Sequence, residues 1–209
     1  MDEALFGRIR RELLSVFLFN PSTSFYLLEL VSLLRTGRGG VQRELGNLVS
    51  AGLVSRRREG VRVLFSLAED CPAAGELEAL LRAVTDTGAA LEVVLRDHRR
   101  SIQVAVVDGS AAETRHGKTR LMIVAEDVPD SLQEDLERLE IMTGTSLETV
   151  LMKPESVKGI TGSIPETDWV LAPAAVYILG SPEDMMPTEP AGKELDGEPD
   201  LFSGLGLDW

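Results

Sequence analysis

The chain has few of the residues that form disulfides and metal sites. Among its 209 residues there is one cysteine, Cys71, and there are two histidines, His98 and His116. A single cysteine cannot form an intramolecular disulfide or a thiolate cluster for zinc or a soft metal. Two histidines are too few for a convincing site without several carboxylates, so we interpret both as surface histidines. The sequence therefore predicts no metal and no cofactor.

Long apolar runs are also missing. No stretch approaches the roughly 18 apolar residues of a membrane-spanning helix, and residues 1–14, MDEALFGRIRRELL, lack the apolar core of a signal peptide. We therefore expect a cytoplasmic protein with no membrane contact. Its composition, 44% hydrophobic and 26% charged, is ordinary for a globular protein, and its length allows one large or two small domains.

The most informative stretch is residues 24–67, where two amphipathic segments and a Gly-rich turn precede two β-rich runs that meet at Glu59-Gly60. The second segment places Val41, Leu45, Leu48 and Val49 on one face of a helix. Beyond Gly52 the pattern changes to period two, which predicts a hairpin whose buried face carries Val61, Val63, Phe65 and Leu67. The order is helix, turn, helix, hairpin.

Positive charge is concentrated in this stretch. Residues 35–62 hold seven arginines against two glutamates, a net charge of +5, in a chain whose net charge is -13. Residues 86–180 carry nine basic and 16 acidic side chains, and residues 181–209 carry one and eight. A basic island on an acidic protein is typical of a polyanion-binding surface, although such arginines can also serve only solubility.

Two stretches carry a resemblance to a known family: FYLLELVSLLR and GGVQRELGNLVSAGLVSRRREGVRVLFSL. Over about residues 5–85 the chain resembles the winged helix-turn-helix of ArsR-type transcription regulators. The resemblance implies binding to double-stranded DNA by a homodimer, with the helix over residues 41–50 in a major groove and the hairpin on the DNA backbone or minor groove. Three glycines in the turn before that helix depart from the expected Ser or Thr cap. The expected DNA-binding residues are Arg38, Gln42, Arg43, Asn47, Arg56, Arg57, Arg58 and Arg62.

The flanking segments complete an α+β pattern. A helix over residues 4–19 ends at Asn20-Pro21, and another helix begins near Asp70-Cys71-Pro72, where it either packs on its own domain or forms a dimer contact. Gly88 is expected to separate that helix from the next. The remaining elements are strands over 102–107, 121–124, 147–152 and 176–179, a helix over 131–141, and a possible helix from Pro154.

The C-terminal half of the chain resembles the nucleotidyltransferase fold over about residues 86–180. The resemblance lies in the order of a strand, Gly109-Ser110, a polar loop and a second strand, which is how that fold begins. That family needs two carboxylates, one residue apart, to hold Mg²⁺. Lys118 and Arg120 stand at those positions, and neither ligates a divalent cation. The resemblance therefore implies a catalytically degenerate domain with no catalytic residues, kept for binding or assembly. A possible nucleotide or anion site would use Gly109, Ser110, Lys118 and Arg120, although Gly109-Ser110 can also be a simple tight turn.

The sequence thus predicts three parts: a winged-helix domain over 1–85, a nucleotidyltransferase-like domain over 86–180, and an acidic, flexible tail over 181–209. The tail ends in LFSGLGLDW, which suits docking to a partner protein or competition with DNA for the hairpin arginines. The leading function is a DNA-binding transcription regulator. The alternatives are an active nucleotidyltransferase with a DNA-binding module, and a protein-interaction module.

Overall fold

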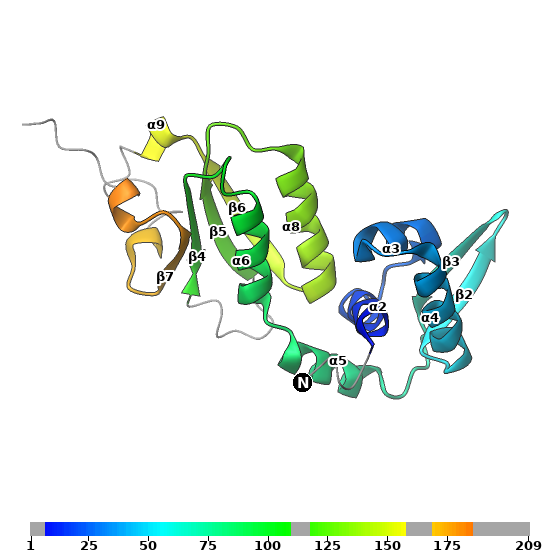
Figure 1. Ribbon diagram of the computed structural model, residues 1–209. Helices are drawn as coiled ribbons and strands as arrows, with labels where there is room; N and C mark the ends of the chain where they lie inside the picture. Colours follow the sequence, from blue (N-terminus) through cyan, green and yellow to red (C-terminus); the bar gives the residue numbers. More distant parts are fainter. Residues whose placement is uncertain (1–6, 110–117, 158–168, 186–209) are drawn as a thin grey trace, which may run out of the picture.

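The computed structural model describes residues 7–109, 118–157 and 169–185, and it has an α+β architecture with two separate sheets (Figure 1). Residues 7–84 form an N-terminal unit of helices with a small sheet. The described residues from 86 to 185 form a C-terminal unit around a larger sheet. The expected tail lies outside the described residues from residue 186 onward.

The N-terminal unit has the predicted order of helix, turn, helix and hairpin. A two-residue strand, β1, pairs with β3, and β3 pairs with β2 in an antiparallel hairpin. The core is formed mainly by Leu13, Phe17, Leu30, Leu34 and Leu45. The elements are α2 (Arg8–Phe19), β1 (Phe25–Tyr26), α3 (Leu27–Leu34), α4 (Arg38–Ser50), β2 (Val54–Glu59), β3 (Arg62–Leu67) and α5 (Ala74–Val84).

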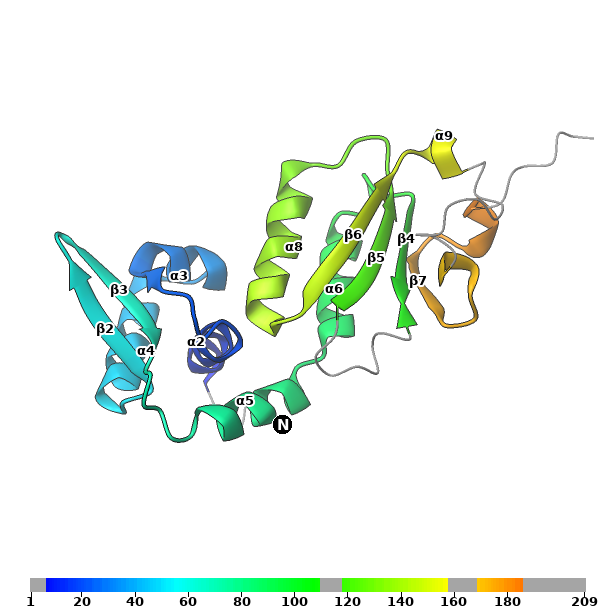
Figure 2. The same ribbon diagram turned by 180° about the vertical axis from the view of Figure 1, so that it is seen from behind.

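The C-terminal unit has a four-stranded mixed sheet in the order β6-β5-β4-β7. Strand β4 is antiparallel to both β5 and β7, whereas β5 and β6 are parallel and are connected through α8. Helices α6 and α8 cover one face, as the two opposite views show (Figures 1 and 2). The elements are α6 (Thr87–Asp97), β4 (Val104–Asp108), β5 (Lys118–Val124), α8 (Asp130–Thr143), β6 (Ser146–Met152), α9 (Pro154–Val157), β7 (Ala175–Leu179) and a 3₁₀ turn (Pro182–Met185).

Helix α4 begins earlier than the hydrophobic pattern predicted. It starts at Arg38, so Gly39 and Gly40 lie in its first turn, and its N-cap Gly37 makes no side-chain capping bond. A Cβ atom on Gly40 would lie 2.7 Å from Cδ1 of Ile9 in α2. Gly40 therefore allows close packing of α4 on α2, which offsets the low helix propensity of glycine.

Three other local predictions need correction. Helix α5 begins at Ala74, so Pro72 lies in the preceding turn. The break before α6 lies at Thr85-Asp86 instead of at Gly88, because the Asp86 carboxylate caps the helix by accepting a hydrogen bond from the Ala89 amide at 2.9 Å. In the hairpin, Val61 is 93% exposed at the tip and Leu64 is the buried residue of β3. The hairpin extends beyond the core, so the period-two pattern did not identify its buried face.

The two units meet where α2 lies beside α8 (Figures 1 and 2). The Asn20 side chain donates to the carbonyls of Val16 and Ile141, both at 2.8 Å, and thereby connects the helices. Ile141 and Met142 of α8 pack against the N-terminal core. The C-terminal unit therefore supports the helices from which the arginine-rich surface projects.

Candidate nucleic-acid interface

Helix α4 has the predicted two faces. Val41, Leu45 and Leu48 are at most 3% exposed and point into the N-terminal core. The expected contact residues Arg38, Gln42, Arg43 and Asn47 are all exposed on the same helix. Arg38 forms no ion pair with any residue that the structure describes. Arginine, glutamine and asparagine are the side chains that read guanine and adenine edges or bind phosphate.

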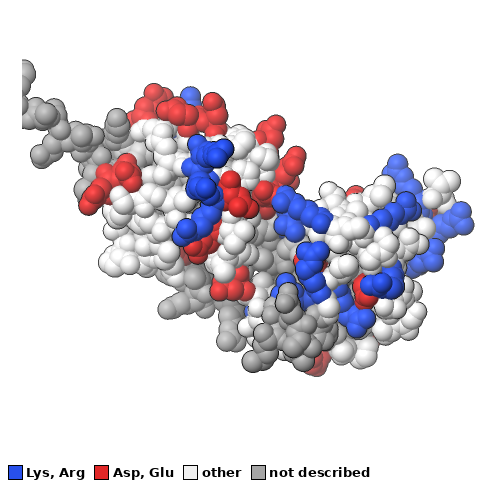
Figure 3. Space-filling model, in the orientation of Figure 1, with Lys and Arg blue, Asp and Glu red and all other residues white. Residues whose placement is uncertain are grey.

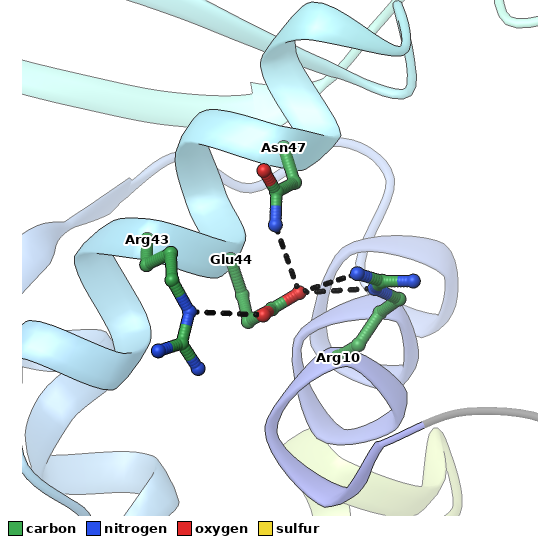
Figure 4. A network of polar contacts seen from close by, with 4 residues as sticks. All are labelled: Arg10, Arg43, Glu44 and Asn47. Carbon is green, nitrogen blue, oxygen red and sulfur yellow. Dashed lines mark hydrogen bonds and ion pairs between the residues drawn. The ribbon is translucent and has the colours of Figure 1, made fainter.

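Glu44 lies at the centre of a polar network on this helix (Figure 4). Its Oε2 accepts from Arg10 Nε of α2 at 3.0 Å and from Asn47 Nδ2 at 3.4 Å, and its Oε1 lies 3.5 Å from Arg43 Nε. Partial burial raises the pKa of Glu44, but the bonds from Arg10, Asn47 and Arg43 outweigh burial and lower it overall. Glu44 therefore stays ionised and orients three side chains toward one region of the surface.

Local sequence patterns do not single out Arg10. Arg10 and Glu44 are 34 positions apart, so helical periodicity within either segment carries no signal of their pairing. Arg8, Arg10, Arg43 and Glu44 line a surface hollow of about 370 Å³ beside the start of α2. The N-terminal end of α2 thus adds positive charge next to the exposed face of α4.

The hairpin arginines are exposed and only weakly constrained. Arg57 pairs with Glu59 at 2.7 Å, and Arg58 Nε donates to the Gly60 carbonyl at 3.0 Å. Arg62 lies over the Tyr26 ring, with 5.4 Å from its Cζ atom to the ring centroid. Arg56 forms no ion pair within the described part of the chain. Exposed pairs of this kind contribute little to stability, so these cations are available to an external anion.

We use the name arginine surface for the exposed contact residues of α4 and the hairpin. The two elements are adjacent, because α4 packs against β2. In Figure 3, blue atoms of Lys and Arg gather over the N-terminal unit and out to the hairpin tip, whereas red atoms dominate the upper rim of the C-terminal unit around one separate basic stripe. The arginine surface consists of Arg38, Gln42, Arg43, Asn47, Arg56, Arg57, Arg58 and Arg62.

The cations of the possible anion site in the C-terminal unit have different surroundings. Arg120 on β5 donates from Nε to Asp108 at 2.9 Å and makes a second bond to the same carboxylate, while its guanidinium lies 5.2 Å from the Trp169 ring centroid. Lys118 pairs with Glu148 on β6 at 3.1 Å. Arg120 is therefore held by a buried carboxylate, an arrangement that disfavours an added anion, whereas the Lys118–Glu148 pair is exposed.

The other predicted members of that site are only partly placed. Gly109 follows β4, and a Cβ atom there would lie 2.3 Å from the Ala174 carbonyl oxygen, so close approach of the backbone before β7 explains the glycine. Ser110 lies outside the described residues. Among the residues that the structure describes, no group of three or more His, Cys, Asp or Glu side chains is arranged to hold a metal ion.

Comparisons of the chain with protein-family models, with curated proteins and with solved structures found no match. Over the described ranges, none of the helices combines the length and the apolar character needed to cross a membrane. We therefore infer a function from the geometry and charge of the chain itself.

Proposed function

We propose that this chain is a sequence-specific, double-stranded DNA-binding transcription regulator whose N-terminal unit is a winged helix. Helix α4 enters a major groove and presents Gln42, Arg43 and Asn47 to base edges or phosphates. The hairpin, as the wing, places Arg56, Arg57 and Arg58 against the DNA backbone or the minor groove.

The observation that supports this proposal best is the combination of exposure and local charge on the arginine surface. Its arginines are exposed, and those in ion pairs have only exposed or short-range partners. The chain as a whole carries a net charge of -13, so positive potential is localised on the N-terminal unit. A local basic surface next to groove-sized helix and hairpin elements suits the DNA duplex.

The C-terminal unit, in this proposal, is a nucleotidyltransferase-like domain that has lost its metal-binding acids. Asp108 and Glu148, the carboxylates nearest the lost positions, are paired with Arg120 and Lys118. Both carboxylates are already paired with cations of the chain and would be poor ligands for Mg²⁺, so the unit serves binding or assembly instead of phosphoryl transfer.

Homodimerisation is part of the proposal, with α5 as its contact. Leu81 is buried and Leu77 packs against the N-terminal core, so one face of α5 holds its own unit together. Leu80 is 39% exposed on the helix and is available to a second copy. A two-fold dimer would place two α4 helices on a palindromic DNA site.

Selection of bound duplexes from a randomised pool tests the DNA-binding proposal. The wild-type chain is expected to enrich one sequence motif, and Arg43→Ala is expected to relax the base preference at one position by about 1–3 kcal/mol of discrimination. Ser32→Ala on α3, an exposed residue outside the arginine surface, is the matched control. Recovery of an unenriched pool by the wild-type chain would overturn sequence-specific binding.

The two alternatives have separate readouts. An active nucleotidyltransferase would transfer label from a nucleotide in the presence of Mg²⁺, and the pairing of Asp108 and Glu148 with cations argues against that activity. A protein-interaction module would bind its partner with little sensitivity to a polyanion such as heparin, whereas duplex binding by arginines is expected to be strongly inhibited.

A further inference from the structure

A cavity of about 440 Å³ lies between the two units, where α2, the α5–α6 connection and α8 meet. Its size falls within the roughly 300–1,000 Å³ range of small-molecule sites. Its walls combine apolar side chains with charged residues from both units. The cavity is separate from the arginine surface.

Glu12 of α2 lines this cavity, and its carboxylate lacks a hydrogen-bond partner at one oxygen. The residue is 9% exposed, and its Oε1 lies 3.8 Å from Arg8 Nη1. Its Oε2 is the one buried side-chain oxygen or nitrogen, within the described ranges, that has no hydrogen-bond partner. A buried carboxylate oxygen without a hydrogen-bond donor is unfavourable, so an N–H or O–H group placed beside this carboxylate would be stabilising.

Arg138 of α8 supplies the opposite charge. Its Nε donates to the Leu33 carbonyl, and the structure gives it no ion pair with another described residue. Burial, followed by the like charge of Arg35, lowers the pKa of Arg138, and the negative charge of Glu12 acts in the opposite direction. The N–H groups of Arg138 beyond Nε are free to bind a carboxylate, which guanidinium groups favour.

Besides Glu12 and Arg138, the polar residues of the cavity wall are Arg11, Ser15, Thr85, Asp86 and Thr143, and the last three form hydrogen bonds within the fold. The Thr85 and Thr143 hydroxyls donate to the carbonyls of Leu81 and Leu139, both at 2.8 Å, and Asp86 caps α6. The rest of the wall is largely apolar. Its apolar members are Val84, Ala90, Val93, Val94, Leu139 and Met142.

We propose that this cavity binds a free α-amino acid with an apolar side chain. The ammonium group of the ligand donates to the Glu12 carboxylate, the carboxylate of the ligand accepts from Arg138, and its side chain packs against the apolar wall. This ligand class supplies the missing donor, an anion for the guanidinium and an apolar surface in a molecule that fits the cavity.

Calorimetric titration of the full chain tests the proposal directly, without DNA. The probes are L-valine, L-leucine, L-isoleucine, L-methionine and L-phenylalanine, each at millimolar concentration. At least one of them is expected to bind saturably. For leucine as the ligand, 3-methylbutylamine lacks the carboxylate and 4-methylpentanoate lacks the ammonium group, and each is expected to bind about tenfold more weakly or worse. An absence of saturable binding by all five amino acids would overturn the proposal, because the cavity would then hold only water.

Two variants connect the binding to this cavity. Glu12→Gln keeps the side-chain shape and is expected to weaken binding by about tenfold or more, while the unfolding temperature stays level or rises because a buried charge whose Oε2 atom has no hydrogen-bond partner is removed. Glu92→Gln makes the same chemical change on the solvent-facing part of α6, where Glu92 pairs with Arg96, and is expected to leave binding unchanged. Val93→Trp, at a residue that is 60% exposed on the cavity wall, is expected to obstruct entry without disturbing the core. Unchanged affinity in both Glu12→Gln and Val93→Trp would place the ligand elsewhere.

Discussion

Arg120 of the C-terminal unit and Arg57 of the hairpin have opposite surroundings. On β5, Arg120 is paired with Asp108, which is 4% exposed, and the guanidinium also contacts the Trp169 ring. On the hairpin, Arg57 has as its partner Glu59, on the same strand, and the two side chains are 70% and 52% exposed. An exposed pair exchanges easily with an external anion, whereas a pair with a buried carboxylate does not.

This difference separates a structural role of arginine from a binding role within one chain. Removing Arg120 leaves the buried carboxylate of Asp108 uncompensated, so the expected cost is in stability. Removing a cation from the arginine surface leaves no buried charge behind, so the expected cost is in DNA affinity.

The combined variant Arg56→Ala, Arg57→Ala and Arg58→Ala is expected to reduce duplex affinity by about 100-fold at low salt, and to reduce the slope of log K against log salt by about three. The reason is the loss of up to three phosphate contacts, each worth roughly 0.9 in the slope. Titrations of a labelled duplex at several salt concentrations measure both quantities.

The matched control is Arg99→Ala with Arg100→Ala, two exposed arginines of the C-terminal unit. Their removal lowers the net charge but lies outside the arginine surface. An equal loss of affinity in the control would mean that overall charge, and not the hairpin, governs binding.

Arg120→Ala is expected to destabilise the chain by about 2–4 kcal/mol, because Asp108 would remain buried without its cation. Lys118→Ala removes a pair whose side chains are 68% and 53% exposed and is expected to cost less than about 1 kcal/mol. Urea denaturation measures both. Adding Asp108→Asn to Arg120→Ala is expected to recover part of the lost stability. Similar losses of stability for Arg120→Ala and Lys118→Ala would contradict the difference between a buried and an exposed ion pair.

Glu44→Gln is expected to raise affinity for random duplex DNA by a few-fold, roughly 0.5–1 kcal/mol, since one negative charge leaves the contact region. The preference for the selected motif is expected to fall at the same time, because Arg10, Arg43 and Asn47 lose their common anchor. Competition between selected and random duplexes measures this ratio. A variant with unchanged preference would show that Glu44 does not position the reading residues.

The last prediction concerns pH and the contact between the units. Asp135 of α8 pairs with Arg35 at the end of α3 and accepts from His98 Nε2 at 2.9 Å. Burial raises the pKa of Asp135, but the bonds from His98 and Arg35 outweigh burial and lower it below 3.8. The resulting stability is fully present above the unfolded pKa, near 3.8, and is lost as the pH falls through the lower folded pKa.

Acid unfolding of wild type and Asp135→Asn measures this contribution. The variant is expected to be less stable than wild type at neutral pH by about 1 kcal/mol, and the difference is expected to vanish at pH values below the folded pKa. A difference that persists unchanged into acid would assign the effect to packing instead of charge.

The sequence predicted what depends on local periodicity. The buried stripe of α4, the hairpin and the succession of helices and strands in the C-terminal unit follow from neighbours within a few positions. Glu12 carries a charge, which favours an exposed position, but the structure buries it because α8 covers its face of α2. Gly40 lies in the first turn of α4, where the local pattern does not indicate a helix.

In the candidate site, too, the residues that follow from local spacing were predictable and those that depend on contacts between distant elements were not. The exposed residues of α4 follow from the position of its apolar stripe, so Gln42, Arg43 and Asn47 were predictable from spacing alone. The contribution of Arg10 was not, because it depends on how α2 crosses α4. The pairing of Arg120 with Asp108 depends on the register of β4 and β5 and on Trp169, which comes from a distant part of the chain.

Hydrogen exchange of the full chain with and without a bound duplex tests most directly whether the arginine surface binds DNA. We expect slower exchange in α4 and in the hairpin, over residues 38–67, and unchanged exchange in β5 and β6, where the cations are paired internally. Protection confined to β5 and β6, or no protection anywhere at saturating duplex, would contradict the assignment of the arginine surface as the DNA-binding site.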